Sequence, residues 1–552
     1  MEPEGGLSGR SLAAMATPVM LVLMLCPGAA LPLEFTVYRM QQYNLQGQRH
    51  GCRTSLVHAE SRTLDADLLT RRCVIMRLAD FTHKRYQEVL SQSAGAVLML
   101  VPQNASDALE HQHFMEVEMD LLVNETMLPI YFAIEDTDLL TVYEESKAVS
   151  KSLTSSSALE VMFGMVMGSG FQMEAGETQS KPISDPVIVT LEGYLPGQGE
   201  PEDLPTVVIV AHYDSFGAAP YLSFGADSNG SGVAAVLELM RLFHGLYSDA
   251  RSRARYNLLF ALTGAGKFNY QGSKRWLEEH LDHSETSLLL DNVAFVLCVD
   301  TLANGDSLYL HASKPPKEGT AQWDFMIALQ EVMNSPPFKS MNFSVVHKKI
   351  NLGEELLGWE HEQFSLRRIP AFTMSHLDSH RHGLKNTILD TRSQIDIQRL
   401  KRNAEILAES LVRFMYKLTR KNIPENLQVF EGEQGIDEPR LSAILDWLVL
   451  QPRAAQLINK DHPLLTTMEY FLKRYLSNVK RHVFKADERE PEFVFYDQLK
   501  QTMTSHRVKP AVFDLLVAIV IAAYLGIVHQ VIQSYGQMYR RFVALIMKAK
   551  IK

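Results

Sequence analysis

The chain has 552 residues and a formal net charge of −10 at pH 7, and its four cysteines are too few for a disulfide-built scaffold. Hydrophobic residues make up 46% and charged residues 21% of the chain, which excludes a fibrous or globally disordered protein. The acidic balance disfavours nucleic-acid binding, which needs a basic face, and the length favours several domains.

Residues 1–30 are predicted to be a secretory signal peptide. An apolar run at 19–25 is followed by the small residues of Cys26–Ala30, which is typical of a cleavage region. The alternative is a signal anchor, but the apolar run is too short to cross a hydrocarbon core about 30 Å thick.

A secreted or luminal chain is open to glycosylation and to disulfide formation. Asn-X-Ser/Thr acceptor sequences occur at Asn104, Asn124, Asn229 and Asn342. Cys52 and Cys73 are close enough in sequence to form a disulfide in an oxidising lumen. Cys298 lies in an apolar run and is expected to be a buried thiol.

Residues 33–182 are predicted to form a smaller α/β lobe and a linker. Short apolar runs at 97–101 and 128–132 alternate with helical stretches such as 82–91. Residues 150–182 are rich in Ser, Gly and Met, so this part is expected to connect or pack between lobes.

Residues 183–420 show alternating strands and helices. Continuous apolar runs, typical of buried parallel strands, occur at 207–211, 258–262, 293–299 and 371–374. Helices are expected at about 230–243 and 273–280. The alternation predicts an α/β fold, a mostly parallel sheet with helices on both faces, whose function lies at the carboxyl ends of the strands.

The C-terminal part is predicted to meet a membrane. Residues 421–509 are charged and expected to be a helical juxtamembrane region, with helices near 438–450 and 462–481. Residues 511–532 form an apolar stretch of about 33 Å as a helix, long enough to span. The basic tail, 533–552, favours a cytosolic C-terminus and a luminal bulk; a buried core helix is the alternative.

Four polar blocks follow the four predicted strands. They occupy residues 211–215, 225–232, 263–273 and 386–391. In order and spacing these blocks resemble the di-zinc aminopeptidase superfamily, and within it the branch of nicastrin and nicalin, over about 186–420. The run Phe268–Ser273 is closer to nicastrin than to active peptidases, while the length and single span resemble the nicalin group.

The resemblance implies a set of positions that would hold two zinc ions and a carboxylate base. His212 and Asp214 match a histidine ligand and its orienting aspartate, and Asp300 matches a further ligand. The remaining positions depart from the family pattern, because a bridging carboxylate, two glutamates and a histidine are replaced by Ser228, Gly266, Lys267 and Asn386.

A shifted register could restore part of this set. A slip of one residue would return Asp227 to the bridging position, and a moved loop could supply His376, His380 or His382. The glutamates cannot be restored, because residues 251–277 contain no Asp or Glu. An ammonium beside a zinc ion costs several kcal/mol, since one unit pair at 4 Å contributes about 4 kcal/mol. The sequence therefore predicts no cofactor and no catalysis, with one weakly held metal as the most to be expected.

Three nearby features have plain interpretations. The run Ser375–His382 is expected to be a solvated loop at the rim of the cleft. His361 and its acidic neighbours are expected to be polar residues on the surface. Asn229 either carries a glycan that crowds the cleft or caps the following helix.

The favoured function is a non-catalytic luminal scaffold. Resemblance to the nicalin group implies residence in the endoplasmic reticulum membrane and a complex with Nodal modulator and a small multi-pass membrane protein. It further implies association with the Sec translocon and ribosome during multi-pass protein insertion, and a link to Nodal signalling. Two alternatives stay open, an active zinc aminopeptidase with displaced ligands and a receptor that binds peptide N-termini without cutting.

Overall fold

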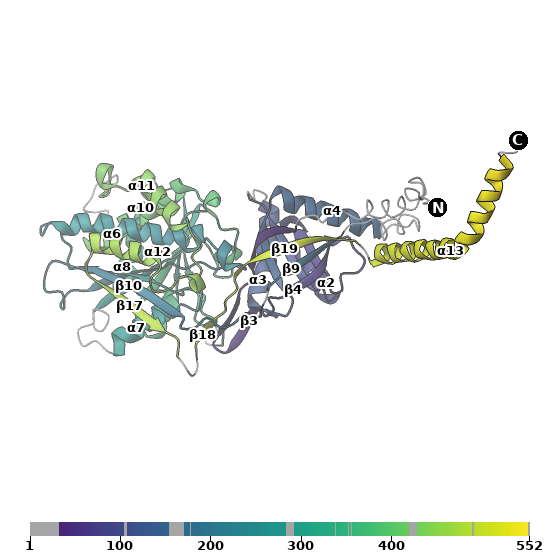
Figure 1. Cartoon of the computed structure of the whole chain (residues 1–552). Helices are drawn as coiled ribbons and strands as arrows, with labels where there is room; N and C mark the ends of the chain where they lie inside the picture. The colour runs from purple at the N-terminus through teal and green to yellow at the C-terminus, as the bar shows by residue number, and fades with distance from the viewer. Residues whose placement is uncertain are drawn as a thin grey trace.

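A computed structural model describes residues 32–549 except 104–107, 154–169, 283–291, 419–427 and positions 177, 337, 340, 352, 355, 488, 490 and 510. The expected signal peptide and the acceptor Asn104 lie outside the described residues. An α/β unit, a β-barrel and a long C-terminal helix follow one another along the molecule (Figure 1).

The α/β unit is built on an eight-stranded sheet. Its order is β15 (Asn342–His347), β14 (Ser307–Ala312), β16 (Ala371–Ser375), β13 (Val293–Val299), β11 (Thr206–His212), β12 (Asn257–Thr263), β10 (Val187–Leu195) and β17 (Ser477–Lys485). The four central strands are the four predicted ones, and they run parallel to one another. Every residue of β11 and β12 is buried, as their continuous apolar sequences predict.

Helices cover both faces of this sheet, as predicted. One face is covered by α6 (Gly232–Ser248), α8 (Ala321–Met333), α10 (Ile397–Met415), α11 (Glu438–Leu448) and α12 (Pro463–Tyr475). The other face is covered by α7 (Gln271–Asp282) and α9 (His361–Leu366). The side chain of Asp396 starts α10 by accepting hydrogen bonds from the backbone N–H groups of Gln398 and Arg399.

The N-terminal lobe is a closed barrel with helices around it. Its strands, in order, are β1 (Leu33–Arg39), β19 (Lys500–Val508), β9 (Gly170–Ala175), β4 (Val57–Arg62), β5 (Cys73–Arg77), β6 (Ala96–Val101) and β8 (Ile130–Ile134). Its helices are α2 (His83–Ser91), α3 (Ala108–Val123) and α4 (Thr137–Leu153). The predicted helix and apolar runs of this lobe are confirmed.

The prediction of a helical region at 421–509 is wrong for its second half. Helix α12 ends at Tyr475, and residues 477–508 form the strands β17, β18 (Phe493–Phe495) and β19. Strand β17 joins the large sheet beside β10, and β19 lies between β1 and β9 in the barrel. Strand β18 pairs in a small sheet with β2 (Gln42–Leu45), β3 (Gln48–Cys52) and β7 (Glu125–Thr126). The C-terminal part therefore completes both units before it reaches the membrane helix.

The expected disulfide between Cys52 and Cys73 is not formed. Both residues are buried free thiols. Cys52 packs in one hydrophobic cluster of the barrel unit and Cys73 in another, and the Cys52 thiol donates to the backbone oxygen of Leu128 over 3.1 Å. Cys298 is a buried thiol, as predicted.

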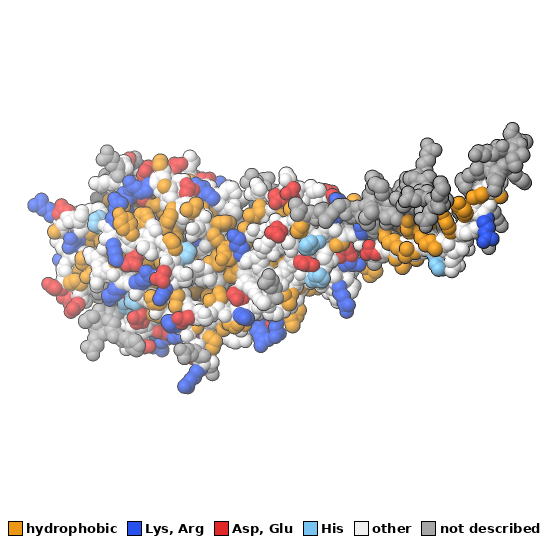
Figure 2. Space-filling model, viewed as in Figure 1, with side chains coloured by type: hydrophobic (Ala, Val, Ile, Leu, Met, Phe, Trp, Pro, Cys, Tyr) orange, Lys and Arg blue, Asp and Glu red, His pale blue; other side chains and the backbone are white. Residues whose placement is uncertain are grey.

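The last described element is α13 (Ala511–Ala549). Its segment Asp514–Gly536, 23 residues with a mean hydropathy of 2.4, is the one helix among the described residues that is long and apolar enough to cross a membrane. Hydrophobic side chains cover its visible surface (Figure 2). The predicted helix is confirmed, and it continues past Ile532.

Candidate functional site

The predicted site lies where the central strands end. His212 is the last residue of β11 and Thr263 the last of β12, while Asp300 follows β13 and His376 follows β16. Because these strands are parallel, their carboxyl ends bring the polar blocks together at one edge of the sheet. All four residues are buried.

His212 is held by a glutamate that sequence reasoning placed on the surface. Its Nδ1 lies 3.2 Å from Oε2 of Glu360. Oε1 of Glu360 accepts from the hydroxyls of Thr263, over 2.8 Å, and Ser273. These contacts fix the imidazole with its Nε2 buried and without a hydrogen bond.

The segment around Glu360 is buried, so the prediction that His361 and its neighbours lie on the surface is wrong. His361 is buried, and its Nδ1 lies 2.9 Å from the hydroxyl oxygen of Thr373. Burial lowers the pKa of His361 to about 3, so the ring is neutral at physiological pH. The short helix α9 packs this segment against the sheet, a tertiary contact that a polar sequence does not reveal.

Asp214 organises the third block instead of orienting His212. Its carboxylate accepts from the backbone N–H groups of Gly266, over 2.7 Å, and Lys267, over 3.2 Å. Burial raises the pKa of Asp214 above its ordinary value. A Cβ atom added to Gly266 would lie 2.3 Å from Cγ of His212, so the loop leaves no room for a glutamate at that position.

In the second block, residues 225–232, the side chain of Asp227 makes the contacts that matter for the site. Oδ2 of Asp227 lies 2.7 Å from Nε2 of His376, and Oδ1 accepts from the backbone N–H of Ala303 over 2.9 Å. Burial alone would raise the pKa of Asp227, but the charge and hydrogen bond of His376 outweigh burial and lower it. Asp227 is therefore committed to His376, and His376 is a buried partner, not part of the solvated rim loop that the sequence suggested.

Two lysines occupy the cleft. The ammonium of Lys385 is 3.1 Å from Oδ2 of Asp300 and 3.9 Å from the centre of the Trp359 ring, and Lys385 is only 5% exposed. Nζ of Lys267 donates to the hydroxyl of Ser228 over 2.6 Å and to the backbone oxygen of Lys385 over 2.8 Å.

These charges set the ionisation of the cleft. Burial lowers the pKa of Lys267 to about 8, so its ammonium loses its proton more readily than an exposed lysine. Burial alone would raise the pKa of Asp300, but the charges of Lys385, His212 and Lys267 hold it well below its ordinary value. Asp300 is thus an ionised carboxylate whose charge is balanced by protein cations.

The residues present do not fit a pair of zinc ions. Two ions that each take about four ligands need several free carboxylates and imidazoles. At the matched positions, His212 Nε2 and Asp300 Oδ2 are buried ligand atoms without a hydrogen bond, but the ammonium of Lys385 already lies against Asp300. At the other matched positions, Ser228, Gly266 and Lys267 offer no carboxylate.

Lys385 is the cleft residue that sequence reasoning missed. It directly precedes Asn386, the position matched to the final histidine, in the turn Gly383–Asn386. Asn386 itself is half-buried. The available signal was a lysine one residue from a ligand position, in a chain that already had Lys267 in place of a glutamate.

The acceptor sequences differ in exposure. Asn229 is fully buried, and its amide nitrogen, the atom that a glycan would occupy, donates to the backbone oxygen of His212 over 2.6 Å. A glycan at Asn229 is therefore incompatible with the fold, which corrects that expectation. Asn124 and Asn342 are exposed.

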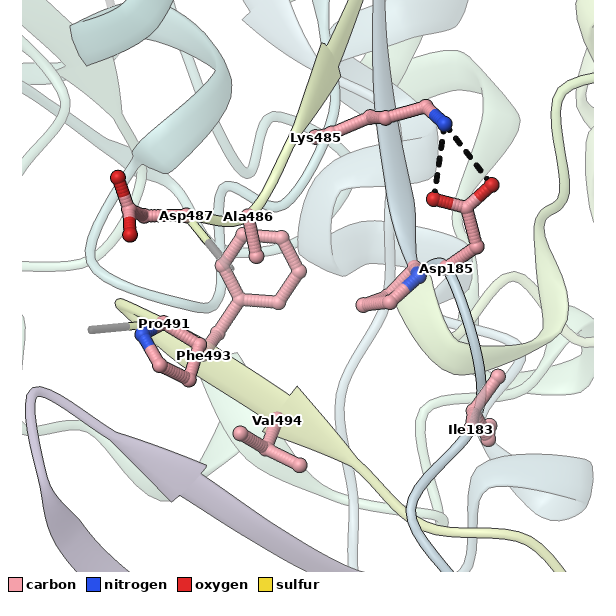
Figure 3. A pocket seen from close by; sticks show the side chains of 9 residues that line it. Ile183, Asp185, Lys485, Ala486, Asp487, Pro491, Phe493 and Val494 are labelled. Atoms are coloured by element: carbon pink, nitrogen blue, oxygen red, sulfur yellow. Dashed lines mark hydrogen bonds and ion pairs between the residues drawn. The ribbon is translucent and has the colours of Figure 1, made fainter. Parts of the chain in front are cut away.

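A separate surface pocket of about 310 Å³ lies beside the strands that connect the two units. Figure 3 shows its lining, including the ion pair of Lys485 and Asp185 at 2.9 Å. Its residues are Ile183, Asp185, Pro186, Lys485, Ala486, Asp487, Pro491, Phe493 and Val494. None of the residues matched to the peptidase site belongs to it.

Comparisons with known proteins show relatives of this chain in sequence and in fold. Residues 187–411 match peptidase family M28. The dog (Canis lupus familiaris) and human (Homo sapiens) proteins named BOS complex subunit NCLN are both 53% identical to this chain over 534 residues, which is 96% of this chain and 94% of each relative. The chain belongs to the nicalin family. The Caenorhabditis elegans protein named nicalin is 27% identical over 541 residues, 95% of this chain and 94% of that protein.

The chain shares its fold with a solved structure. The crystal structure of nicastrin, a component of gamma-secretase, superposes with a TM-score of 0.59 at 12% identity. The superposition covers 86% of this chain and 99% of that one. Nicastrin and this chain thus share a fold, and the resemblance seen in the sequence blocks is confirmed.

Proposed function

We propose that this protein is a non-catalytic, single-pass subunit of a membrane complex, with the bulk of its chain in the lumen of the endoplasmic reticulum. The relatives named BOS complex subunit support assembly into that complex. The apolar segment Asp514–Gly536 and the basic residues that follow it favour a cytosolic C-terminus.

The observation that carries the proposal is the ion pair of Lys385 and Asp300. A lysine ammonium against the buried carboxylate supplies the positive charge that a metal ion would otherwise bring. Residues 251–277 also lack any acid, so the block that supplies the base and a ligand in active peptidases supplies neither here. The peptidase fold then serves as a rigid body for binding partners.

The partners proposed are those that the resemblance to the nicalin group implies. They are Nodal modulator and a small multi-pass membrane protein, and through them the Sec translocon and the ribosome during multi-pass protein insertion. Modulation of Nodal signalling would follow from the same assembly. The two folded units and the membrane helix provide luminal and membrane surfaces for such contacts.

Co-purification of the full chain from cells in mild detergent tests this function. We expect stoichiometric membrane partners and no hydrolysis of aminoacyl-p-nitroanilides, with or without added Zn²⁺. A matched variant, in which Asp514–Gly536 is replaced by an unrelated apolar helix of equal length, should still insert but recover less of the multi-pass partner. Chelator-sensitive hydrolysis, or a preparation with no membrane partner, would overturn the proposal.

A further inference from the structure

A second group of metal-type ligands lies outside the peptidase-like cleft. Glu192 on β10, His280 on α7 and His482 on β17 bring one ligand atom each to within 4.8 Å of one another. Oε2 of Glu192 is 2.8 Å from Nε2 of His280, and Oε1 is 3.4 Å from Nε2 of His482. Three segments that are far apart in sequence thus meet at one carboxylate.

The group is shielded from solvent. The side chains of Glu192, His280 and His482 are 5%, 11% and 10% exposed. Nε2 of His482 is buried and makes no hydrogen bond, although it faces the carboxylate. This nitrogen makes only the ion-pair contact with Glu192 and lies within reach of both other ligand atoms.

Neighbouring side chains hold these ligands in position. Nδ1 of His482 lies 2.9 Å from Oε2 of Glu279, which directs the opposite nitrogen, Nε2, towards Glu192. Nε1 of Trp276 donates to Oε2 of Glu192 over 2.7 Å and orients that carboxylate. A carboxylate behind a ligand histidine is the arrangement that fixes the tautomer and ring orientation in metal sites.

We propose that Glu192, His280 and His482 bind one divalent transition-metal ion, with Zn²⁺ as the ion best suited to two imidazoles and a carboxylate. His482 also lines a surface cavity of about 440 Å³. Lys480 is the competing cation, with its ammonium 3.6 Å from Oε1 of Glu192. Its side chain is 53% exposed, so it can turn into solvent when the ion binds.

The site would fasten the C-terminal strand to the α/β unit. Strand β17 is the edge strand that pairs with β10, and the chain continues from it into the barrel and the membrane helix. An ion held by β10, α7 and β17 would tie this edge at its centre. The inference does not rest on the proposed function, because no residue of the cleft takes part in it.

The test uses the full chain in detergent, stripped with a chelator and then titrated with Zn²⁺ or Co²⁺. We expect one equivalent of Zn²⁺ to bind and to raise the unfolding temperature by several degrees at a hundredfold excess over its dissociation constant. Co²⁺ should give the visible absorption of a tetrahedral nitrogen and oxygen site. His280→Gln and His482→Gln should each weaken binding at least tenfold, while the exposed His347→Gln serves as the matched control and should bind as the native chain does.

The outcomes separate this site from the cleft. Binding that survives both substitutions but is lost in Asp227→Asn or Asp300→Asn would place the ion in the cleft and overturn this inference together with the proposed function. No uptake of Zn²⁺ or Co²⁺ by the native chain would overturn this inference alone. If one glutamine variant fails to fold, the other, compared with Asp227→Asn and Asp300→Asn, still decides which group holds the ion.

Discussion

At the scale of single residues, Lys385 is the direct ion-pair partner of the buried carboxylate of Asp300. Lys385→Met should lower the unfolding free energy of the α/β unit by about 3 kcal/mol, because it leaves Asp300 buried without its ion-pair partner. Urea unfolding followed by tryptophan fluorescence measures the change.

A second substitution isolates the ion pair from the packing. In Lys385→Met with Asp300→Asn the neutral amide keeps its place without the charge, so most of the lost stability should return. The exposed Lys317→Met is the control for loss of a lysine alone. A double variant no more stable than Lys385→Met would contradict this account of the cleft.

The buried side chain of Glu118 makes the stability of the folded chain depend on pH. This residue of α3 is fully buried, and its Oε1 accepts from the backbone N–H groups of Ala218, over 2.7 Å, and Ile388, over 3.1 Å. Burial raises the pKa of Glu118 from 4.5 to about 7. Between about pH 4.5 and pH 7 the unfolded chain has lost this proton while the folded chain keeps it. The free energy of unfolding therefore falls as pH rises through this range.

Glu118→Gln removes this titration while keeping an acceptor oxygen. At pH 5 the variant should resemble the native chain, and at pH 8 it should be more stable by up to about 3 kcal/mol. Unfolding temperatures measured from pH 5 to 8 give the comparison, with the exposed Glu116→Gln on the same helix as control. A difference that does not change with pH would be evidence against a buried, protonated Glu118.

At this scale, the residues at the matched ligand positions could be predicted from the sequence, but the residues that contact them could not. His212, Asp214 and Asp300 could be placed because they directly follow strongly apolar strands. Glu360 and Lys385 could not, since each enters the cleft from a loop whose path depends on tertiary packing. The buried state of Asn229 was missed for the same reason.

At the scale of elements, one arginine joins the segment after α11 to the cleft loops. Arg453 is 1% exposed, and its guanidinium donates to the backbone oxygens of Tyr213, Phe224 and Gly225. A guanidinium reaches several carbonyls at once, which an ammonium cannot do in the same fixed geometry.

Arg453→Lys should therefore cost about 3 kcal/mol of unfolding free energy, the loss of one or two charge-assisted hydrogen bonds. Chemical denaturation detects this loss, and Arg440→Lys, on the exposed part of α11, provides the matched substitution. Equal stability of the two variants would show that Arg453 does not hold these loops together.

The elements that sequence predicted and those it missed differ in the range of their contacts. Strands β11, β12, β13 and β16 have continuous apolar sequences that identify them locally. Strand β17 alternates in burial, and its partner β10 lies almost 300 residues earlier, so its polar residues were taken for a helix. The barrel strand β19 was missed for the same reason.

At the scale of the whole molecule, the glycans report on orientation. If the bulk of the chain is luminal, the exposed Asn124 and Asn342 are accessible to the glycosylation machinery, whereas the buried Asn229 is not. Asn124→Gln and Asn342→Gln should each remove one endoglycosidase-sensitive shift in mobility on a gel. Asn229→Gln should leave the number of glycans unchanged, and a glycan lost from that position would contradict the buried cleft.

At the same scale, paired strands join the C-terminal helix to both folded units. The final strands complete first the large sheet and then the barrel, and α13 follows directly (Figure 1).

The most direct measurement is the location of metal in crystals of the full chain grown with Zn²⁺, by anomalous diffraction at the zinc edge. The account predicts no zinc peak between His212, Asp227 and Asp300, and the ammonium of Lys385 in contact with Asp300. Two peaks about 3.5–4 Å apart in that cleft, the spacing of a two-metal site, would contradict it.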